Sequence, residues 1–321
     1  MIGLNSVCYY TMVCFATPLF LSNSSIGSGM CKAYDSDNPD RKSLIIDISP
    51  CTRDMADSVK DCFQYGPLNT LMLTNTIRKK EELTSFGLPS GHLDMDHLIL
   101  FNVPFPNYFG YNEAEGRKNV TSLTAIKNDL LLSSTGLRRY KFQHIRLDEC
   151  VLRRQFQISL EELLFTDRLM TLVLKNGRDA DPWFAFEYDL APNLKGLTIN
   201  GFRMKSLKTN RDNKFPSLES LDVSNNQIGY IDPDCFTGMP KLAEINLENN
   251  NLRNLHLSMV TNFNKILVDG NSFMADVRTC ILLRAPQVIF RHLKSVCDVF
   301  EDIMYPETTT ASSTYPKNIE L

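Results

Sequence analysis

The sequence lacks the short motifs by which many catalytic and metal sites are recognised. None of its five histidines stands in a His-Glu-x-x-His frame, and neither Gly-x-Ser-x-Gly nor a phosphate-cradling glycine loop occurs. No Cys-x-x-Cys pair has a partner at the spacing of a zinc site. These absences argue against an enzyme, and we expect neither a metal nor a cofactor.

Excess charge and long apolar runs are also scarce. A formal net charge of −3 gives no reason to expect nucleic acid or an acidic membrane as partner. Residues 7–21 form the one long apolar run, which is too short to span a membrane and suits an export signal, although no Lys or Arg precedes it. We predict a signal peptide at 1–25 and a secreted, extracellular protein without a transmembrane segment. A buried N-terminal strand is the alternative.

Two copies of one apolar pattern, 24 residues apart, are the strongest positive signal. Both fit L-x-x-L-x-L-x-x-N-x-L, with Leu218, Leu221, Val223, Asn226 and Ile228 in the first copy and Leu242, Ile245, Leu247, Asn250 and Leu252 in the second. This is the signature of a leucine-rich repeat. One repeat cannot bury its apolar side chains alone, whereas stacked repeats bury them jointly beneath a parallel sheet.

The Asn of the template, here called the ladder position, has its own physical reason. It ends the strand facing inward, where its amide can pair with backbone N–H and C=O groups of adjoining turns. An apolar side chain there would leave buried polar backbone unpaired. Asn128, Cys150 and Asn271 occupy this position in other copies, whereas Thr76, Val103, Gly177 and Phe202 depart from it.

Weaker copies on both sides extend the array to about nine. Their intervals of 21 to 27 residues agree with the expected period, and they begin at Leu68, Met95, Val120, Phe142, Leu169, Leu194, Leu218, Leu242 and Phe263. The sequence therefore predicts an α/β leucine-rich repeat solenoid with disulfide caps. A curved parallel β-sheet should form its concave face, and short helices and loops its convex face.

Two segments between the predicted strands have features of the convex side. Residues 153–165 carry apolar side chains at helical spacing. Asp232 followed by Pro233 suits the start of a short helical turn, with Asp as its cap and Phe236 directed inward.

Cysteines gather near both ends of the predicted array. Solenoid ends expose apolar core unless they are capped, and exported proteins can close such caps with disulfides. We expect the pair Cys280–Cys297 and a second pair among Cys31, Cys51 and Cys62. Seven cysteines remain after signal removal, so one is left over. We assign this role to Cys150, buried and outside any disulfide, its thiol donating weakly to a neighbouring carbonyl.

The predicted organisation has five parts. They are a signal peptide (1–25), an N-terminal cap (26–67) with a strand at 44–48, the repeats (68–273), a C-terminal cap (274–304) and a tail (305–321). The tail is rich in Thr, Ser and Pro, which favours either disorder or an O-glycosylated stalk. Asn119 begins the sequon Asn119-Val120-Thr121 and is a predicted N-glycosylation site in a secreted chain.

Residues 218–252, with IDPDCFTGMPKL between the two strands, resemble the animal extracellular leucine-rich repeats. Toll-type receptor ectodomains, secreted insect immune repeat proteins and small matrix proteoglycans carry such repeats. GNSF at 270–273, followed by Cys280 and Cys297, resembles the C-terminal cap of that family, although its Trp and its closely spaced Cys pair are missing.

The resemblance implies a secreted protein that binds a protein or a glycan, with innate immunity as one expected role and homo- or heterodimerisation left open. A soluble or truncated receptor ectodomain and a matrix structural protein are the alternatives. An enzyme is a disfavoured third class. His144, Arg146 and Asp148 alternate on one predicted strand and are the remaining candidates for a catalytic group, but a polar, solvent-exposed strand face explains them without catalysis.

The concave face supplies the candidate binding residues, because strand side chains alternate between the two faces of a sheet. From the N-terminal end they are His97, Ile99 and Phe101, then His144, Arg146, Asp148 and Lys175, then Asp222, Glu244, Glu248 and Asp269. We expect the first group to form an exposed apolar stretch and the last to be acidic and relieved only by Lys265. An apolar patch of this kind often marks a contact site, whereas a solvated face without a partner is the alternative.

Overall fold

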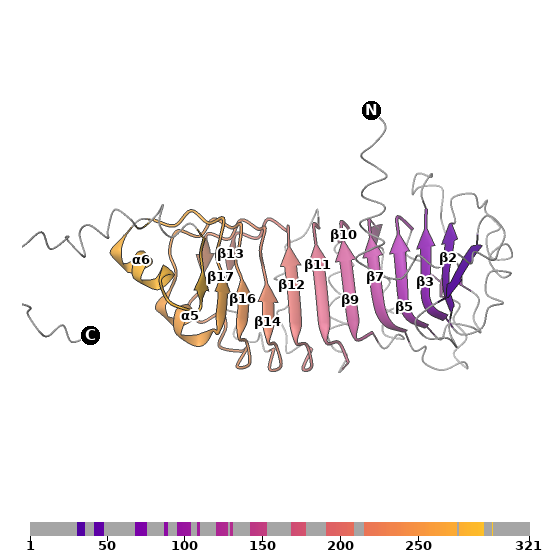
Figure 1. Ribbon diagram of the computed structural model, residues 1–321, viewed down its shortest axis with the longest axis horizontal. Helices are drawn as coiled ribbons and strands as arrows, with labels where there is room; N and C mark the ends of the chain where they lie inside the picture. The colour runs from indigo at the N-terminus through magenta and orange to yellow at the C-terminus, as the bar shows by residue number, and fades with distance from the viewer. Residues whose placement is uncertain are drawn as a thin grey trace, which may run out of the picture.

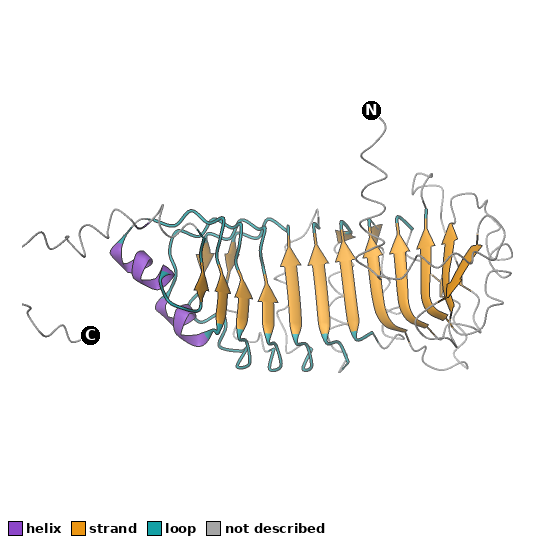
Figure 2. Cartoon of the chain, in the orientation of Figure 1, coloured by secondary structure: helices purple, strands orange, loops and turns teal. Residues whose placement is uncertain are grey.

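The computed structural model describes residues 31–35, 42–47, 68–75, 87–88, 95–103, 108–109, 120–127, 129–130, 142–152, 168–177, 191–208, 215–274, 276–291 and Cys297. Over these residues one long sheet runs the length of the molecule, with its strands side by side in sequence order (Figure 1). Both described helices lie at the C-terminal end (Figure 2). The chain is a leucine-rich repeat solenoid, as predicted.

Twelve strands of the described residues form the main sheet. β1 is antiparallel to β2, and each later pair is parallel. The strands are β1 (Cys31–Asp35), β2 (Lys42–Asp47), β3 (Leu68–Thr74), β5 (Met95–Phe101), β7 (Val120–Ile126), β9 (His144–Asp148), β11 (Thr171–Lys175), β12 (Gly196–Asn200), β14 (Ser220–Asp222), β16 (Glu244–Asn246), β17 (Lys265–Leu267) and β18 (Val288–Ile289).

A strand lies at or just after each of the nine predicted starts. β3, β5 and β7 begin at the first apolar residue of the template, whereas the later strands begin two residues downstream. In these later repeats two successive N–H groups share one carbonyl of the preceding repeat. Met170 and Thr171, for example, both donate to the carbonyl of Gln143, at 2.8 and 3.0 Å. This shared acceptor interrupts the regular hydrogen-bond pattern of the sheet at the start of the strand.

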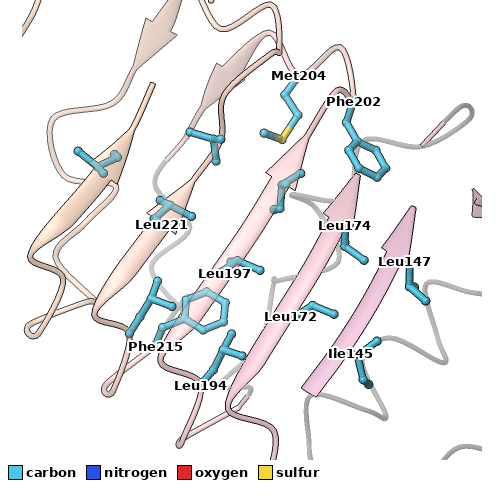
Figure 3. Packing of buried hydrophobic residues seen from close by; sticks show 14 of the residues in the cluster. Ile145, Leu147, Leu172, Leu174, Leu194, Leu197, Phe202, Met204, Phe215 and Leu221 are labelled. Carbon is cyan, nitrogen blue, oxygen red and sulfur yellow. The ribbon is translucent and has the colours of Figure 1, made fainter. Parts of the chain in front are cut away.

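The template's apolar side chains form one continuous core under the sheet. Neighbouring strands are in register, so equivalent positions stack in rows, as Leu172 on Ile145 and on Leu197 (Figure 3). All three are at most 1% exposed. Burying one such side chain contributes about 1.5–3 kcal/mol, and each contribution here depends on the repeats on either side.

The predicted pairing of the ladder amides is confirmed where the template carries Asn. The Asn226 side chain accepts from the N–H of Phe202 at 2.8 Å and donates to the carbonyls of Ile199 and Val223 at 2.7 and 2.9 Å. Asn250 and Asn271 repeat this arrangement one and two turns further on. Thr76 and Asn128 lie outside the described residues.

Gly177 and Phe202 replace the ladder amide in consecutive repeats, and the structure links the two departures. A Cβ atom on Gly177 would overlap the aromatic ring of Phe202. The ring, which is buried, therefore occupies the space that a side chain at position 177 would need. The missing side chain of one repeat is compensated by the large side chain of the next.

From the repeat of β5 onward, the residue before the ladder position has a left-handed backbone. The torsion φ is positive at Asn102, Lys127, Glu149, Asn176, Gly201, Asn225, Asn249 and Gly270. This conformation lets the backbone of the turn continue the hydrogen bonds between neighbouring strands. The N–H of Asn176, for example, donates to the carbonyl of Asn200 at 2.7 Å. Asn and Gly tolerate it best. Lys127 and Glu149 are the exceptions, and their side chains face each other at 3.9 Å.

The convex side differs in part from the prediction. In the described return segments, pairs of two-residue strands are found: β4 (Gly87–Leu88) with β6 (Tyr108–Phe109), β8 (Asp129–Leu130) with β10 (Val151–Leu152), and β13 (Ser206–Leu207) with β15 (Tyr230–Ile231). Asp232 caps the following turn, since its carboxylate accepts from the N–H of Asp234 at 3.1 Å. Phe236 packs edge-on against Phe263. The helix expected from 153–165 lies outside the described residues.

Two short helices and a disulfide form the C-terminal end. The helix α5 (Leu257–Asn262) precedes β17, and α6 (Val277–Leu283) precedes β18. Asp276 caps α6, and its pKa is lowered because the backbone N–H and the hydroxyl of Thr279 donate to its carboxylate. The predicted disulfide joins Cys280 of α6 to Cys297. Neither described helix has the length and apolar content to span a membrane.

Candidate functional site

The concave face bears three columns of side chains that cross the strands. The parallel register places one residue of each of β3, β5, β7, β9, β11 and β12 in each column, whereas the shorter strands β14, β16 and β17 contribute to two columns. The central column is Met72, Ile99, Thr124, Arg146, Val173, Thr198, Asp222, Asn246, Leu267 and Ile289. Adjacent members of a column are about 4.8 Å apart along the sheet. Nine of the eleven predicted binding residues lie in these columns and therefore on one face, whereas Glu248 and Asp269 follow the ends of β16 and β17.

The N-terminal end of this face is apolar. Met72 and Ile99 are neighbours across β3 and β5, and Phe101 and Ile126 are neighbours across β5 and β7. We call these four residues the N-terminal apolar patch. Met72 and Ile126 carry no predicted role, although the template's alternation could have identified both.

The prediction that Ile99 is exposed is wrong, because its side chain is only 8% accessible. It lies between Met72 and Thr124 on the adjacent strands, which cover its flanks. Phe101 is half-buried, and the ammonium of Lys127 lies 6.0 Å from the centre of its ring. His97 is exposed beside them. The patch is therefore a shallow packed surface rather than a set of protruding side chains.

Polar side chains in the middle of the face are hydrogen-bonded to one another. Asp148 is only 7% exposed, and its carboxylate accepts from the guanidinium of Arg146 at 3.1 Å and from the amide of Asn176 at 3.0 Å. Asp148 thus orients Arg146, whose side chain remains 48% exposed. His144 is hydrogen-bonded to the hydroxyl of Thr171 at 2.8 Å. Lys175, half-buried, follows Asp148 in its column.

The C-terminal end of the face is less acidic than predicted. Glu244 lies 3.6 Å from Lys265, as the sequence suggested, but Arg291 also lies 3.0 Å from Asp269. Arg291 follows β18, a strand that the template did not reveal. The carboxylate of Asp222 accepts from the hydroxyl of Ser224 at 2.6 Å and from its N–H at 3.0 Å. Glu248 is half-buried beside them. The expectation that Lys265 alone relieves these acids is wrong.

The cysteine predictions have different outcomes. Cys150 is buried and outside any disulfide, and its thiol donates to the carbonyls of Ala125 and Asp148 at 3.4 and 3.3 Å, as predicted. Cys235 is a second buried thiol, which the odd count did not identify. Cys51 and Cys62, the side chain of Cys31 and the sequon residue Asn119 lie outside the described part of the chain.

Two further features bear on the chemistry of the molecule. In the described residues, no cluster of three or more His, Cys, Asp or Glu side chains could hold a metal ion. An open hollow of about 310 Å³ lies near the C-terminal cap, where no predicted site residue lines it. Its walls include Tyr230, Pro233, Leu252, His256 and Arg278.

A family model and two chains of known structure agree with this architecture. The leucine rich repeat family model matches residues 192–271. A chain of the Toll–Spatzle complex from Drosophila is similar with a TM-score of 0.52 and 14% identity, over 82% of this chain and 38% of that chain. The glycosylated form of that complex gives 0.50 and 14% over the same shares. An internalin from Listeria monocytogenes gives 0.47 and 15%, over 73% and 68%.

These likenesses show the fold and no more. This chain spans well under half the length of the Toll-complex chains that it matches. At 14% identity the likeness shows the fold, which is a leucine-rich repeat solenoid. Solenoids of this kind present extended concave surfaces and generally bind other proteins.

Proposed function

We propose that this chain is a secreted, extracellular binding protein that takes up a protein partner on the N-terminal half of its concave face. The N-terminal apolar patch is the observation that carries the proposal. Its four apolar side chains lie on the face of the sheet opposite the core. They are not needed to fill the core, because a separate set of apolar residues already does so. A contiguous apolar patch on a soluble surface commonly marks a contact site.

The charges around the patch indicate the chemistry of the partner. Lys127 lies over Phe101, and Arg146 is on the next strand but one, about 10 Å from the patch centre by strand spacing. Asp148 fixes Arg146 in place, so less side-chain entropy is lost when a partner binds it. We therefore expect an apolar or aromatic side chain of the partner on the patch and a carboxylate opposite Arg146.

The biological setting is a proposal that rests on resemblance. The repeats resemble animal extracellular ones, and a structural relative is described as a hub in Drosophila development and innate immunity. We propose a role in one of these two settings. A truncated receptor ectodomain, a matrix protein, a glycan-binding protein and an enzyme are the rivals. A longer transcript, binding on a glycan array or robust turnover would favour one of them.

The test begins with capture of the partner from native extracellular fluid, identified by mass spectrometry. Phe101→Ala and Arg146→Ala should each weaken its binding by more than about 1 kcal/mol, because aromatic and Arg anchors dominate such contacts. Thr198→Ala is the matched control, since Thr198 occupies the central column on β12, outside the patch. If both anchor variants remain folded and bind at wild-type strength, the concave face is not the site.

A further inference from the structure

The sequence contains two Asn-Gly pairs, and both lie in the described part of the chain. Asn176 and Gly177 directly follow β11, whereas Asn200 is the last residue of β12 and precedes Gly201. Asparagine before glycine is prone to spontaneous deamidation, because glycine has no side chain to shield its nitrogen from the amide of the asparagine. The surroundings of the two pairs differ, and the difference favours reaction at the first pair.

Asn176 has the freedom that the reaction needs. It is exposed and lies in a turn, with a φ of 52°. Asn200 is half-buried in a strand, and its amide donates to the hydroxyl of Ser224 at 2.8 Å. Deamidation brings the side-chain amide carbon onto the nitrogen of the next residue, which requires a local movement of the backbone. An exposed turn makes such a movement more easily than a strand of the sheet.

Gly177 cannot be replaced without disturbing the core. A Cβ atom at this position would overlap the ring of Phe202, which is buried. The packing that compensates for the missing ladder amide therefore keeps a glycine directly after Asn176. The susceptible pair is thus a consequence of how these two repeats pack.

The reaction consumes water and needs no other reagent. The nitrogen of Gly177 attacks Cγ of Asn176, and the bond from Cγ to the amide nitrogen breaks. That nitrogen leaves as ammonia and takes the proton of the Gly177 N–H with it. Water then opens the succinimide ring, giving aspartate if it attacks Cγ and isoaspartate if it attacks the main-chain carbonyl. Either product has a negative charge at neutral pH where the amide had none.

The new charge would lie against a carboxylate that is already buried. The amide of Asn176 donates to one oxygen of Asp148 at 3.0 Å, and the other oxygen accepts from Arg146 at 3.1 Å. A carboxylate at position 176 has no N–H to donate, and it repels Asp148, which is only 7% exposed. Isoaspartate also lengthens the main chain beside an N–H that donates to the carbonyl of Asn200.

We propose that Asn176 is a site of spontaneous deamidation and that the product disrupts the hydrogen bonds that orient Arg146. The reaction proceeds as the protein ages, and it reduces the positive charge of the concave face near the N-terminal apolar patch. Deamidation itself depends on no partner. Its effect on binding, a weaker site for an acidic group, rests on the proposed function.

The site is tested by incubating the full chain at mildly alkaline pH in water enriched in a heavy oxygen isotope, followed by peptide mapping. The isotope marks residues that react during the incubation and not during digestion. Asn176 should react roughly tenfold faster than Asn200, which corresponds to a barrier lower by about 1.4 kcal/mol. Asn200 is the matched control, because glycine follows it too. If Asn176 reacts no faster than Asn200, the proposal is overturned.

The consequence is tested by denaturant unfolding of variants. Asn176→Asp should shift the midpoint to lower denaturant. Asn225→Asp, the matched control, should leave it nearly unchanged, because Asn225 is exposed in the equivalent turn and its side chain accepts from Asn249. Adding Asp148→Asn to Asn176→Asp exchanges donor and acceptor, so the double variant should unfold at a higher midpoint than Asn176→Asp alone.

Two results would overturn this consequence. The first is a midpoint for Asn176→Asp that equals the midpoint for Asn225→Asp. The second is a double variant that is less stable than Asn176→Asp alone. Neither measurement uses a partner, so their outcome is separate from the binding test on Arg146→Ala.

Discussion

At the scale of single residues, departures from a repeat template need not be defects. Gly177 and Phe202 both lack the ladder amide, yet together they conserve volume, since the ring of one fills the space left by the other. Phe202 also keeps part of the ladder, because its N–H donates to the side chain of Asn226. Restoring the template residue at one of the two positions would therefore conflict with the residue at the other position.

We predict that Gly177→Asn, which restores the template, destabilises the protein by about 1–3 kcal/mol through overpacking against the Phe202 ring. Phe202→Ala alone should cost about 3–5 kcal/mol, because it leaves a cavity. The double variant should cost clearly less than the sum, which denaturant unfolding would measure as a coupling energy. Strictly additive losses would show that the two positions do not share one space.

The buried thiols lead to a second prediction at this scale. Burial, reinforced by the negative charge of Asp232, raises the pKa of Cys235 well above its usual range. Iodoacetamide should therefore leave Cys235 and Cys150 unmodified in the folded protein, even at pH 9, and modify both in denaturant, as peptide mapping would show. The unfolded chain ionises Cys235 near pH 9.0 while the fold keeps its proton, so the free energy of unfolding should fall above that pH. Labelling of the folded protein at either site would contradict the burial described.

At the scale of the elements, strand register decides which side chains face the core. Leu221 on β14 and Leu247 just after β16 are at most 1% exposed, whereas Ser220 on β14 is exposed. We predict that Leu221→Asp and Leu247→Asp each abolish secretion, because each buries an unpaired charge in a core shared by neighbouring repeats. Ser220→Asp is the matched control and should be secreted normally. Immunoblots of medium and cell lysate would compare the variants, and secretion of either Leu variant would overturn the register.

Much of the fold could be predicted from the sequence, because the template is a local consequence of burial. Asn226 and Asn250 fix the phase of two repeats, and their period then located the strands of the other seven predicted repeats. The left-handed turns were missed, although Asn176, Gly201 and Asn225 are residue types that tolerate positive φ. Lys127 and Glu149 also have positive φ, but their residue types do not indicate it.

The detail of the concave face was harder to predict, because it depends on pairs of residues far apart in the sequence. The carboxylate of Asp148 accepts a hydrogen bond from the amide of Asn176, which is 28 residues away. Asp269 meets Arg291 only because β18 adds to the sheet after α6. Alternation along a strand shows which side a residue faces. It does not show how much of it the neighbouring strands cover.

At the scale of the whole molecule, charge varies along the concave face in a way that a partner can sense. Glu244 is exposed and pairs with Lys265 near the C-terminal end, far from the N-terminal apolar patch. We predict that Glu244→Ala changes the association rate of the partner and its salt dependence but leaves the dissociation rate nearly unchanged, as a rim charge does. Stopped-flow or surface-plasmon measurements at two salt concentrations would test this. A large change in the dissociation rate would move the contact toward the C-terminal end.

The repeats are joined through one sheet of neighbouring strands, and this arrangement has a mechanical consequence. Each repeat contacts only its two neighbours, so a pulling force at the ends loads all repeats in series and the weakest interface separates first. Repeats such as those of β14 and β16 are 24 residues apart, so each release would lengthen the chain by about 80 Å. The loop between Cys280 and Cys297 would not extend unless its disulfide were reduced. An extension trace should therefore show a series of similar steps, and its total length should increase when a reductant is added.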